Sequence, residues 1–218
     1  MNIFCLKKHR WLYCCLCFFI FSCQENTSKN ISVDKRKSER AQQSILSAIK
    51  YIKSGDIITR TGNDFTSESL RSLNQRNKTY SHCGIASIEN DTVFIYHSIG
   101  GDWNPDQKLK REIFELFSNP EENRGFGIFR YRLDSITEIN LMDTVHLYYK
   151  EMISFDMDFD LKTDHKMYCA EFVGKCLEKA ADKKIKIPHS FLKDFEFIGV
   201  DDIIMHPNCE KIMEIVYK

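Results

Sequence analysis

The sequence lacks the signatures of several common protein classes. It contains no CxxC or HExxH pattern, so a structural or catalytic zinc site has little support. No cluster of basic residues with interleaved aromatics occurs, which leaves nucleic-acid binding without support. No internal repeat or low-complexity segment is present, and the 218 residues include only 9 glycines and 4 prolines. With 43% apolar and 28% charged residues, the composition is that of a globular chain, not a disordered, collagen-like or coiled-coil one.

The longest apolar run, at residues 11–21, is too short to cross a bilayer as a helix, which takes about 20 residues. Basic residues precede it at 7–10, and the run leads into Ser22 and Cys23, which resembles the lipobox of bacterial lipoproteins. The sequence therefore predicts a signal peptide at residues 1–22, a lipid anchor on Cys23 that holds the protein to a membrane, and a polar tether at 23–32. The expected location is the bacterial cell envelope, facing the periplasm or the cell surface. The alternative is a short N-terminal anchor that stays uncleaved.

The remaining chain, residues 33–218, is expected to form a single α+β domain. Its length is sufficient to bury a sizeable core. Without the signal peptide, residues 23–218 contain 28 basic against 31 acidic residues. Apolar periodicity and turn residues predict helices at 34–53, 67–75, 108–117, 140–153 and 168–181, and strands at 56–60, 84–88, 92–97, 127–133, 185–187 and 211–217. The strands 84–88 and 92–97 are expected to form a hairpin.

Cys169 is the candidate nucleophile, because it falls in the first turns of a predicted helix. Unpaired N–H groups and the helix dipole stabilise a thiolate there, and the same N–H groups can hold an oxyanion. Cys176, two turns further along, has neither advantage. However, Cys169 also lies on the apolar face of this helix, so the spacing alone favours a small buried core residue.

His82 and His97 are the candidate partners of this thiol. One begins the first strand of the predicted hairpin and the other ends the second, so both fall at the same end of the hairpin. One histidine could act as the base and the other could orient it. The alternative, that each only caps a strand, is equally compatible with the spacing.

Three motifs resemble the YiiX/YaeF-like family. They are Gly55-Asp56-Ile57-Ile58, Tyr80-Ser81-His82-Cys83-Gly84-Ile85 and Tyr168-Cys169-Ala170-Glu171-Phe172-Val173, in that order. Members of this family are circularly permuted papain-fold cysteine hydrolases related to the NlpC-type cell-wall peptidases, with a small antiparallel sheet packed against helices. The resemblance implies that Cys169 is the nucleophile and His82 the base, with His97 as the third polar residue. Phe155-Asp156, Phe159-Asp160 and Val200-Asp201-Asp202-Ile203 also resemble family segments.

The resemblance implies supporting roles for three more residues. The hydroxyl of Tyr168 is expected near the oxyanion site, and Glu171 is expected to fix the helix start or the adjacent loop. Asp56 is expected either to organise the loop after the first strand or to cap a turn. No metal or cofactor is implied.

We therefore expect an exported cysteine amidase or peptidase that acts on an amide substrate, either a cell-wall peptide or a lipid-linked amide. An acyltransferase of the lecithin–retinol acyltransferase type and a non-catalytic binding lipoprotein are the alternatives. A disulfide from Cys169 to Cys83 or Cys209 would exclude the assignment of Cys169 as the nucleophile. Cys83 should face away from His82, since adjacent strand residues point to opposite faces.

Overall fold

The structure, a computed structural model, describes residues 22–101 and 104–217, with side chains from Lys35 onward. The predicted signal peptide lies outside the described residues, apart from Ser22. Helix α1 (Ser22–Ala48) begins earlier than expected and includes the segment predicted as a tether. No glycine or proline interrupts residues 24–48, so nothing in the local sequence stops the helix. The chain from Arg40 onward forms a compact unit that contains the candidate site.

A six-stranded antiparallel sheet forms the centre of this unit, in the strand order β4-β3-β2-β1-β5-β8. The strands are β1 (Ile57–Gly62), β2 (His82–Glu89), β3 (Thr92–His97), β4 (Lys110–Ile113), β5 (Asn123–Tyr131) and β8 (Cys209–Val216). The expected hairpin is present as β2 and β3. Asn90 and Asp91 at its turn both have positive φ, as a two-residue hairpin turn requires.

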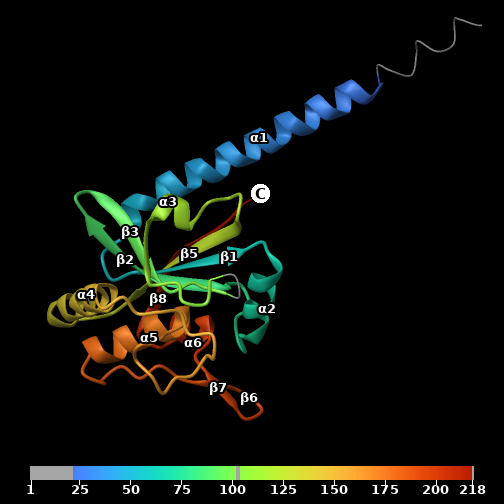
Figure 1. Cartoon of the computed structure of the whole chain (residues 1–218). Helices are drawn as coiled ribbons and strands as arrows, with labels where there is room; N and C mark the ends of the chain where they lie inside the picture. The colour runs from blue at the N-terminus through green and yellow to red at the C-terminus, as the bar shows by residue number, and fades with distance from the viewer. Residues whose placement is uncertain (1–21, 102–103, 218) are drawn as a thin grey trace, which may run out of the picture. The chain divides into compact units, whose positions relative to one another are not determined.

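Each face of the sheet is covered by helices. Helices α4 (Ser135–Lys150) and α5 (Cys169–Ala180) pack on one face, where they meet side chains such as Ile57 and Ile85. The other face, which includes Ile58 and Ile95, is covered by the end of α1 and by the short helix α3 (Phe114–Phe117). Figure 1 shows α4 and α5 on one side of the strands and α3 on the other. The α+β class with an antiparallel sheet is thus confirmed.

Two elements differ from the expectation. The segment predicted as a helix at 108–117 is instead strand β4 followed by α3, because residues 110–113 pair with β3. The segment 185–187 is not a strand, whereas an unpredicted hairpin of β6 (Ser190–Leu192) and β7 (Phe195–Phe197) follows it. In both cases pairing with another segment, rather than local propensity, decides the conformation.

Two shorter helices complete the unit. Helix α2 (Phe65–Leu73) follows β1, and its N-cap residue Asp64 accepts a hydrogen bond of 2.9 Å from the Ser67 N–H. Helix α6 (Val200–Ile204) precedes β8, and the Asp202 carboxylate accepts a hydrogen bond of 2.8 Å from the Gly199 N–H. Both helices lie near the start of β2, as the next section describes.

Candidate active site

Cys169 is the first residue of α5, at the place that the sequence predicted. The Tyr168 before it is extended, and the Tyr168 N–H donates a 3.2 Å hydrogen bond to the Glu171 carboxylate. Glu171 therefore holds the start of the helix. The N–H groups of the first helical turn have no acceptor within the helix, so they are free to stabilise negative charge beside Cys169.

Glu171 is itself completely buried. One of its oxygens lies 2.9 Å from the Lys175 ammonium group one turn further along the helix. Burial outweighs this ion pair and raises the pKa of Glu171 to about 7. The carboxyl that accepts from the Tyr168 N–H thus has a pKa near neutral.

The two candidate histidines are in direct contact. His82 Nε2 and His97 Nδ1 lie 2.8 Å apart, and both side chains are on the α3 face of the sheet. The next strand contributes Glu112, whose Oε1 lies 2.7 Å from His97 Nε2. In the register of the sheet, His97 pairs with Lys110 and Ile95 with Glu112, so His97 and Glu112 are diagonal neighbours. The three side chains form a row across β2, β3 and β4.

This row determines which nitrogen carries each proton. The hydrogen bond from His97 keeps the pKa of Glu112 below its usual range, so the carboxylate can only accept. Burial lowers the pKa of both His82 and His97 to about 4, and both rings are therefore neutral at neutral pH. His97 donates from Nε2 to Glu112 and accepts at Nδ1 from His82 Nε2–H. The free lone pair of His82 is then on Nδ1, which is the atom left to act as a base.

Gly84 leaves the room that this contact needs. A Cβ atom on Gly84 would come within 2.8 Å of the His97 Cβ and 2.7 Å of the Tyr96 carbonyl oxygen. Any side chain at this position would therefore displace His97 or the backbone of β3. Phe117 of α3 packs against both imidazole rings from the same face of the sheet, at centroid distances of 5.7 Å and 5.1 Å.

Cys169 and His82 complete the arrangement: His82 is one of the neighbours that lower the pKa of Cys169, and Cys169 in turn favours the charged form of His82. The pKa of Cys169 is well below its usual range, first because the Cys83 thiol donates to it and then because of His82. All four cysteines after Cys23, which are Cys83, Cys169, Cys176 and Cys209, are free thiols, so no disulfide blocks the candidate nucleophile.

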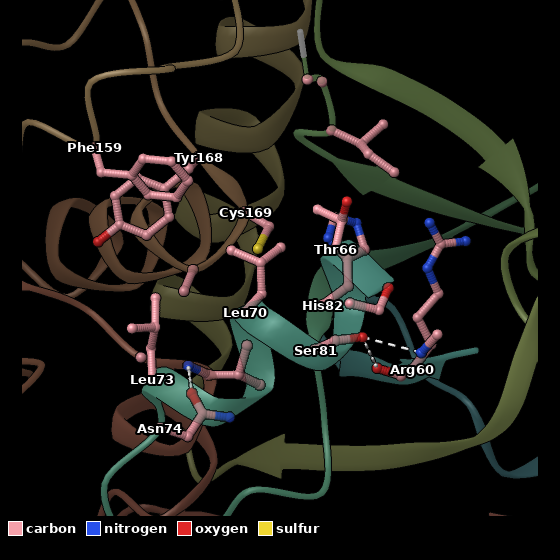
Figure 2. A pocket seen from close by; sticks show the side chains of 18 of the residues that line it. Arg60, Thr66, Leu70, Leu73, Asn74, Ser81, His82, Phe159, Tyr168 and Cys169 are labelled. Carbon is pink, nitrogen blue, oxygen red and sulfur yellow. Dashed lines mark hydrogen bonds between the residues drawn. The ribbon is translucent and has the colours of Figure 1, made fainter. Parts of the chain in front are cut away.

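A cavity of about 680 Å³ opens beside the two groups. Figure 2 shows Cys169, His82, Ser81 and Arg60 at this cavity. One part of its wall is apolar and comes from α2, the loop after Ile153 and the β6–β7 region: Leu70, Leu73, Phe155, Met157, Phe159, Phe195, Phe197 and Ile198. Cys169 is 9% exposed, so its sulfur is protected but reachable from the cavity.

The start of β2 is held in place by polar contacts with α6 and β1. The Asp201 carboxylate accepts from the backbone N–H groups of Gln75 and Arg76, at 2.9 Å and 2.6 Å. Asn74 joins the Val200 N–H to the Tyr80 carbonyl through its side chain. The Val200-Asp201 segment therefore has a structural role, because these bonds fix the residues that lead into His82.

Ser81 and Ser98 fix the flanks of the site. The Ser81 hydroxyl accepts a 3.0 Å hydrogen bond from the Gly62 N–H, which ties the residue before His82 to the end of β1. The Ser98 hydroxyl donates to the Met167 carbonyl at 2.6 Å. Because Ser98 follows His97 and Met167 lies just before Cys169, this bond links the histidine strand to the helix that carries the thiol.

The structure therefore brings together Cys169, His82 and His97, and it places two other predicted site residues elsewhere. The Tyr168 hydroxyl accepts a 2.7 Å hydrogen bond from the Ile198 N–H and points away from the Cys169 sulfur, so it is not an oxyanion donor (Figure 2). Asp56 binds Arg130 at 2.7 Å and the Lys53 N–H at 2.8 Å. It fixes the turn before β1, at the other end of that strand from the site.

Two residues of the site were missed by the sequence analysis. Glu112 was placed in a helix, where it could not have reached His97. From the sequence, Cys83 is expected only as a possible disulfide partner of Cys169 and as a residue that faces away from His82. Its side chain does face away from His82. It lies on the face of the sheet that α5 covers, where it is a neighbour of Cys169.

The fold is similar to that of a protein of known structure, although the sequence matches no family model. No family model matches the sequence, and no curated protein does. The fold is similar to the solved structure of the metalloprotein yiiX from Escherichia coli O157:H7, with a TM-score of 0.61 and 16% identity over 75% of this chain and 98% of that one. The likeness establishes a YiiX-like fold, as the motifs predicted.

Within residues 22–101 and 104–217, no group of three or more His, Cys, Asp or Glu side chains converges as metal ligands would. At the site itself, three of the four ring nitrogens of His82 and His97 are already in contact with each other or with Glu112.

Within residues 22–101 and 104–217, no helix is both long and apolar enough to span a membrane.

The reactivity of the thiols gives a direct test of this geometry. We expect iodoacetamide to label Cys169 rapidly at about pH 6–7, where an ordinary thiol with a pKa near 8.5 is mostly protonated. The rate should fall only at lower pH, as Cys169 passes through its lowered pKa. Cys176 is the matched control, because burial raises its pKa. Mass spectrometry of the labelled peptides measures both rates.

His82→Ala should slow the labelling of Cys169 and move its pH profile toward higher pH, since one stabilising partner of the thiolate is lost. Equal rates for Cys169 and Cys176 in the folded protein would contradict the assignment.

Proposed function

We propose that this protein is a cysteine hydrolase that cleaves amide bonds through Cys169. The observation that carries the proposal is the unbroken series of contacts from Cys169 through His82 and His97 to Glu112, at the edge of a cavity and at a helix N-terminus. We also infer that its fold is the circularly permuted papain-like fold of the YiiX-like hydrolases. The order of His82 before Cys169 along the chain and the YiiX-like architecture support this inference.

In the proposed reaction, the Cys169 thiolate attacks the amide carbonyl carbon, and the backbone N–H groups at the start of α5 stabilise the oxyanion. His82 Nδ1 takes a proton from a water molecule and passes it to the leaving amine as the C–N bond breaks. The hydroxide that remains attacks the acyl carbon, which releases the acyl group as a carboxylic acid and restores the thiolate. Glu112 keeps His97 oriented and stabilises the positive charge on His82 while His82 holds the proton that goes to the leaving amine.

The apolar cavity wall favours a lipid-linked amide over a cell-wall peptide. Stem peptides are rich in carboxylates and amines, which would lose their hydration against phenylalanine and leucine side chains. A hydrocarbon acyl chain gains about 0.8 kcal/mol for each buried CH₂ group. The substrate class we propose is therefore an N-acyl compound whose acyl chain lies along the apolar wall.

Transfer of the acyl group to an amine or alcohol is the second candidate. The same apolar wall supports it, because the acyl-enzyme would be identical and only the acceptor would differ. Product analysis with and without an added amine distinguishes the two outcomes. A non-catalytic binding protein would retain the cavity but would have no need for the Glu112–His97–His82 contacts.

Acyl p-nitroanilides of two and eight carbons provide an assay for both the activity and the substrate class. We expect kcat/KM to be higher for the longer chain by roughly fourfold for each buried methylene. Cys169→Ala should reduce kcat by about 10³-fold or more, and Glu112→Gln, which leaves His97 without its anionic partner, by roughly 10- to 100-fold. Cys176→Ala serves as the matched control and should keep full activity, since its side chain lies in the core two turns from the site.

Full activity in Cys169→Ala would exclude the proposed mechanism. Equal kcat/KM values for the two-carbon and eight-carbon substrates would be compatible with the mechanism but would contradict the proposed substrate class.

We also propose that the protein is attached to the bacterial cell envelope through a lipid on Cys23. The basic residues at 7–10, the apolar run at 11–21 and Cys23 support this proposal. Full-length protein expressed in bacteria should partition into the detergent phase of a Triton X-114 extract, whereas Cys23→Ser should partition into the aqueous phase. If Cys23→Ser instead stays in the detergent phase at full length, the segment is an uncleaved anchor.

A further inference from the structure

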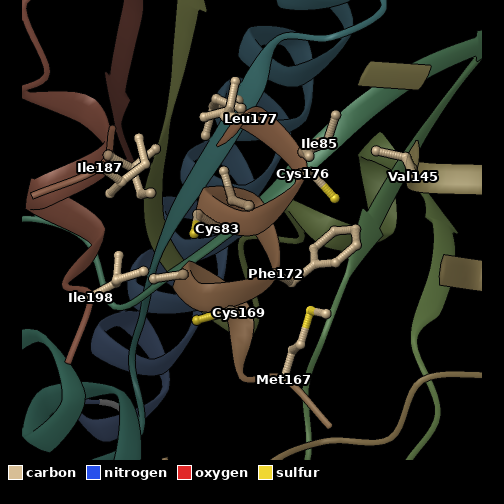
Figure 3. Packing of buried hydrophobic residues seen from close by; sticks show 14 of the residues in the cluster. Cys83, Ile85, Val145, Met167, Cys169, Phe172, Cys176, Leu177, Ile187 and Ile198 are labelled. Atoms are coloured by element: carbon tan, nitrogen blue, oxygen red, sulfur yellow. The ribbon is translucent and has the colours of Figure 1, made fainter. Parts of the chain in front are cut away.

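A second thiol, Cys83, lies beside the candidate nucleophile. It follows His82 on β2 and is completely buried, on the face of the sheet that α5 covers. Cys83 and Cys169 belong to the same buried cluster, and α5 packs directly on β2. In the view of Figure 3, their sulfurs lie on one side of α5, while the sulfur of Cys176 lies on the other.

Cys83 is the neighbour that acts most strongly on the Cys169 thiol. Its thiol and its backbone N–H both favour the Cys169 thiolate and lower the pKa of Cys169. The strand register explains why this N–H is available. Pairing between β2 and β3 extends only from Glu89 back to Ile85, so at Cys83 no β3 residue occupies that side of the strand. The start of α5 occupies it instead.

The two thiols have opposite acidities. Donation from Cys83 keeps the pKa of Cys169 low, whereas the same bond and burial raise the pKa of Cys83. Cys169 also faces the cavity, while Cys83 is shielded behind it. The pair therefore consists of an accessible thiolate and an inaccessible protonated thiol, which is the combination of an attacking and a resolving cysteine.

We propose that Cys83 and Cys169 form a reversible disulfide that switches the nucleophile off under oxidising conditions. The oxidant is hydrogen peroxide, which is small enough to enter the cavity. The Cys169 thiolate attacks the peroxide oxygen to give a sulfenic acid and hydroxide. The Cys83 sulfur then attacks the Cys169 sulfur, its proton leaves with the hydroxyl as water, and the S–S bond forms. A thiol reductant reverses the reaction and restores both thiols.

This disulfide would protect the enzyme as well as inhibit it. A sulfenic acid without a resolving thiol is oxidised further to a sulfinic acid, which thiols do not reduce. The proposal concerns a covalent state of two cysteines, so it stands whether or not Cys169 is shown to hydrolyse an amide.

The test uses the reduced full-length protein and hydrogen peroxide at a small molar excess. Remaining thiols are blocked with N-ethylmaleimide, and the peptides are mapped without reduction. We expect one linked peptide pair, Cys83 with Cys169, a loss of iodoacetamide labelling at Cys169, and full recovery with dithiothreitol. Cys83→Ser keeps a hydroxyl donor at this position, and it should instead accumulate Cys169 sulfinic acid and recover little labelling. Cys176→Ser is the matched control and should behave as the unmodified protein does.

The proposal is overturned if peroxide converts Cys169 to sulfinic acid while Cys83 stays reduced, or if Cys169 pairs with another cysteine. Both results come from the unmodified protein, so they do not depend on how Cys83→Ser folds. Because the readout is the mass of a linked peptide and not hydrolysis, failure of the proposed amidase activity would be seen separately.

Discussion

The site depends on one physical constraint: the start of α5 meets the start of β2 at the end of the sheet. This meeting puts Cys169 at a helix N-terminus and next to an imidazole at the same time. The Ser98 bond to Met167, the Glu171 bond to Tyr168 and the Tyr168 bond to Ile198 all fix the helix start. The Asp201 and Asn74 contacts fix the strand start. Each segment is held by its own polar bonds, so the geometry between them does not rely on the thiol–imidazole contact itself.

Burial is the second feature on which the proposed chemistry depends. His82 and His97 are neutral because they are removed from water, and Glu112 remains charged because His97 and the more distant Arg60 favour its ionised form. A neutral pair beside an anion has one stable arrangement of protons, and that arrangement leaves the free lone pair of His82 on Nδ1. The same exclusion of water strengthens each electrostatic contact in the site.

Much of this site could be predicted from the sequence, because its main residues occur in local patterns. Cys169 opens an amphipathic helix, and His82 and His97 lie on two strands joined by a short turn, so local rules place them correctly. Glu112 could not be found in this way. Its segment has a helix-compatible pattern, and only pairing with β3 makes it a strand and brings the carboxylate to His97. The role of Cys83 likewise depends on where the ladder between β2 and β3 ends, which local sequence does not specify.

The most direct test of the central claim is to look for the covalent intermediate. Full-length protein is mixed with an octanoyl p-nitrophenyl ester, quenched in acid within seconds and measured by intact-mass and peptide mass spectrometry. The account predicts one added octanoyl group on Cys169, its absence in Cys169→Ala, and slower formation in His82→Ala. An acyl group on another residue, or no adduct while p-nitrophenol is released at the same rate by Cys169→Ala, would contradict the claim that Cys169 is the nucleophile.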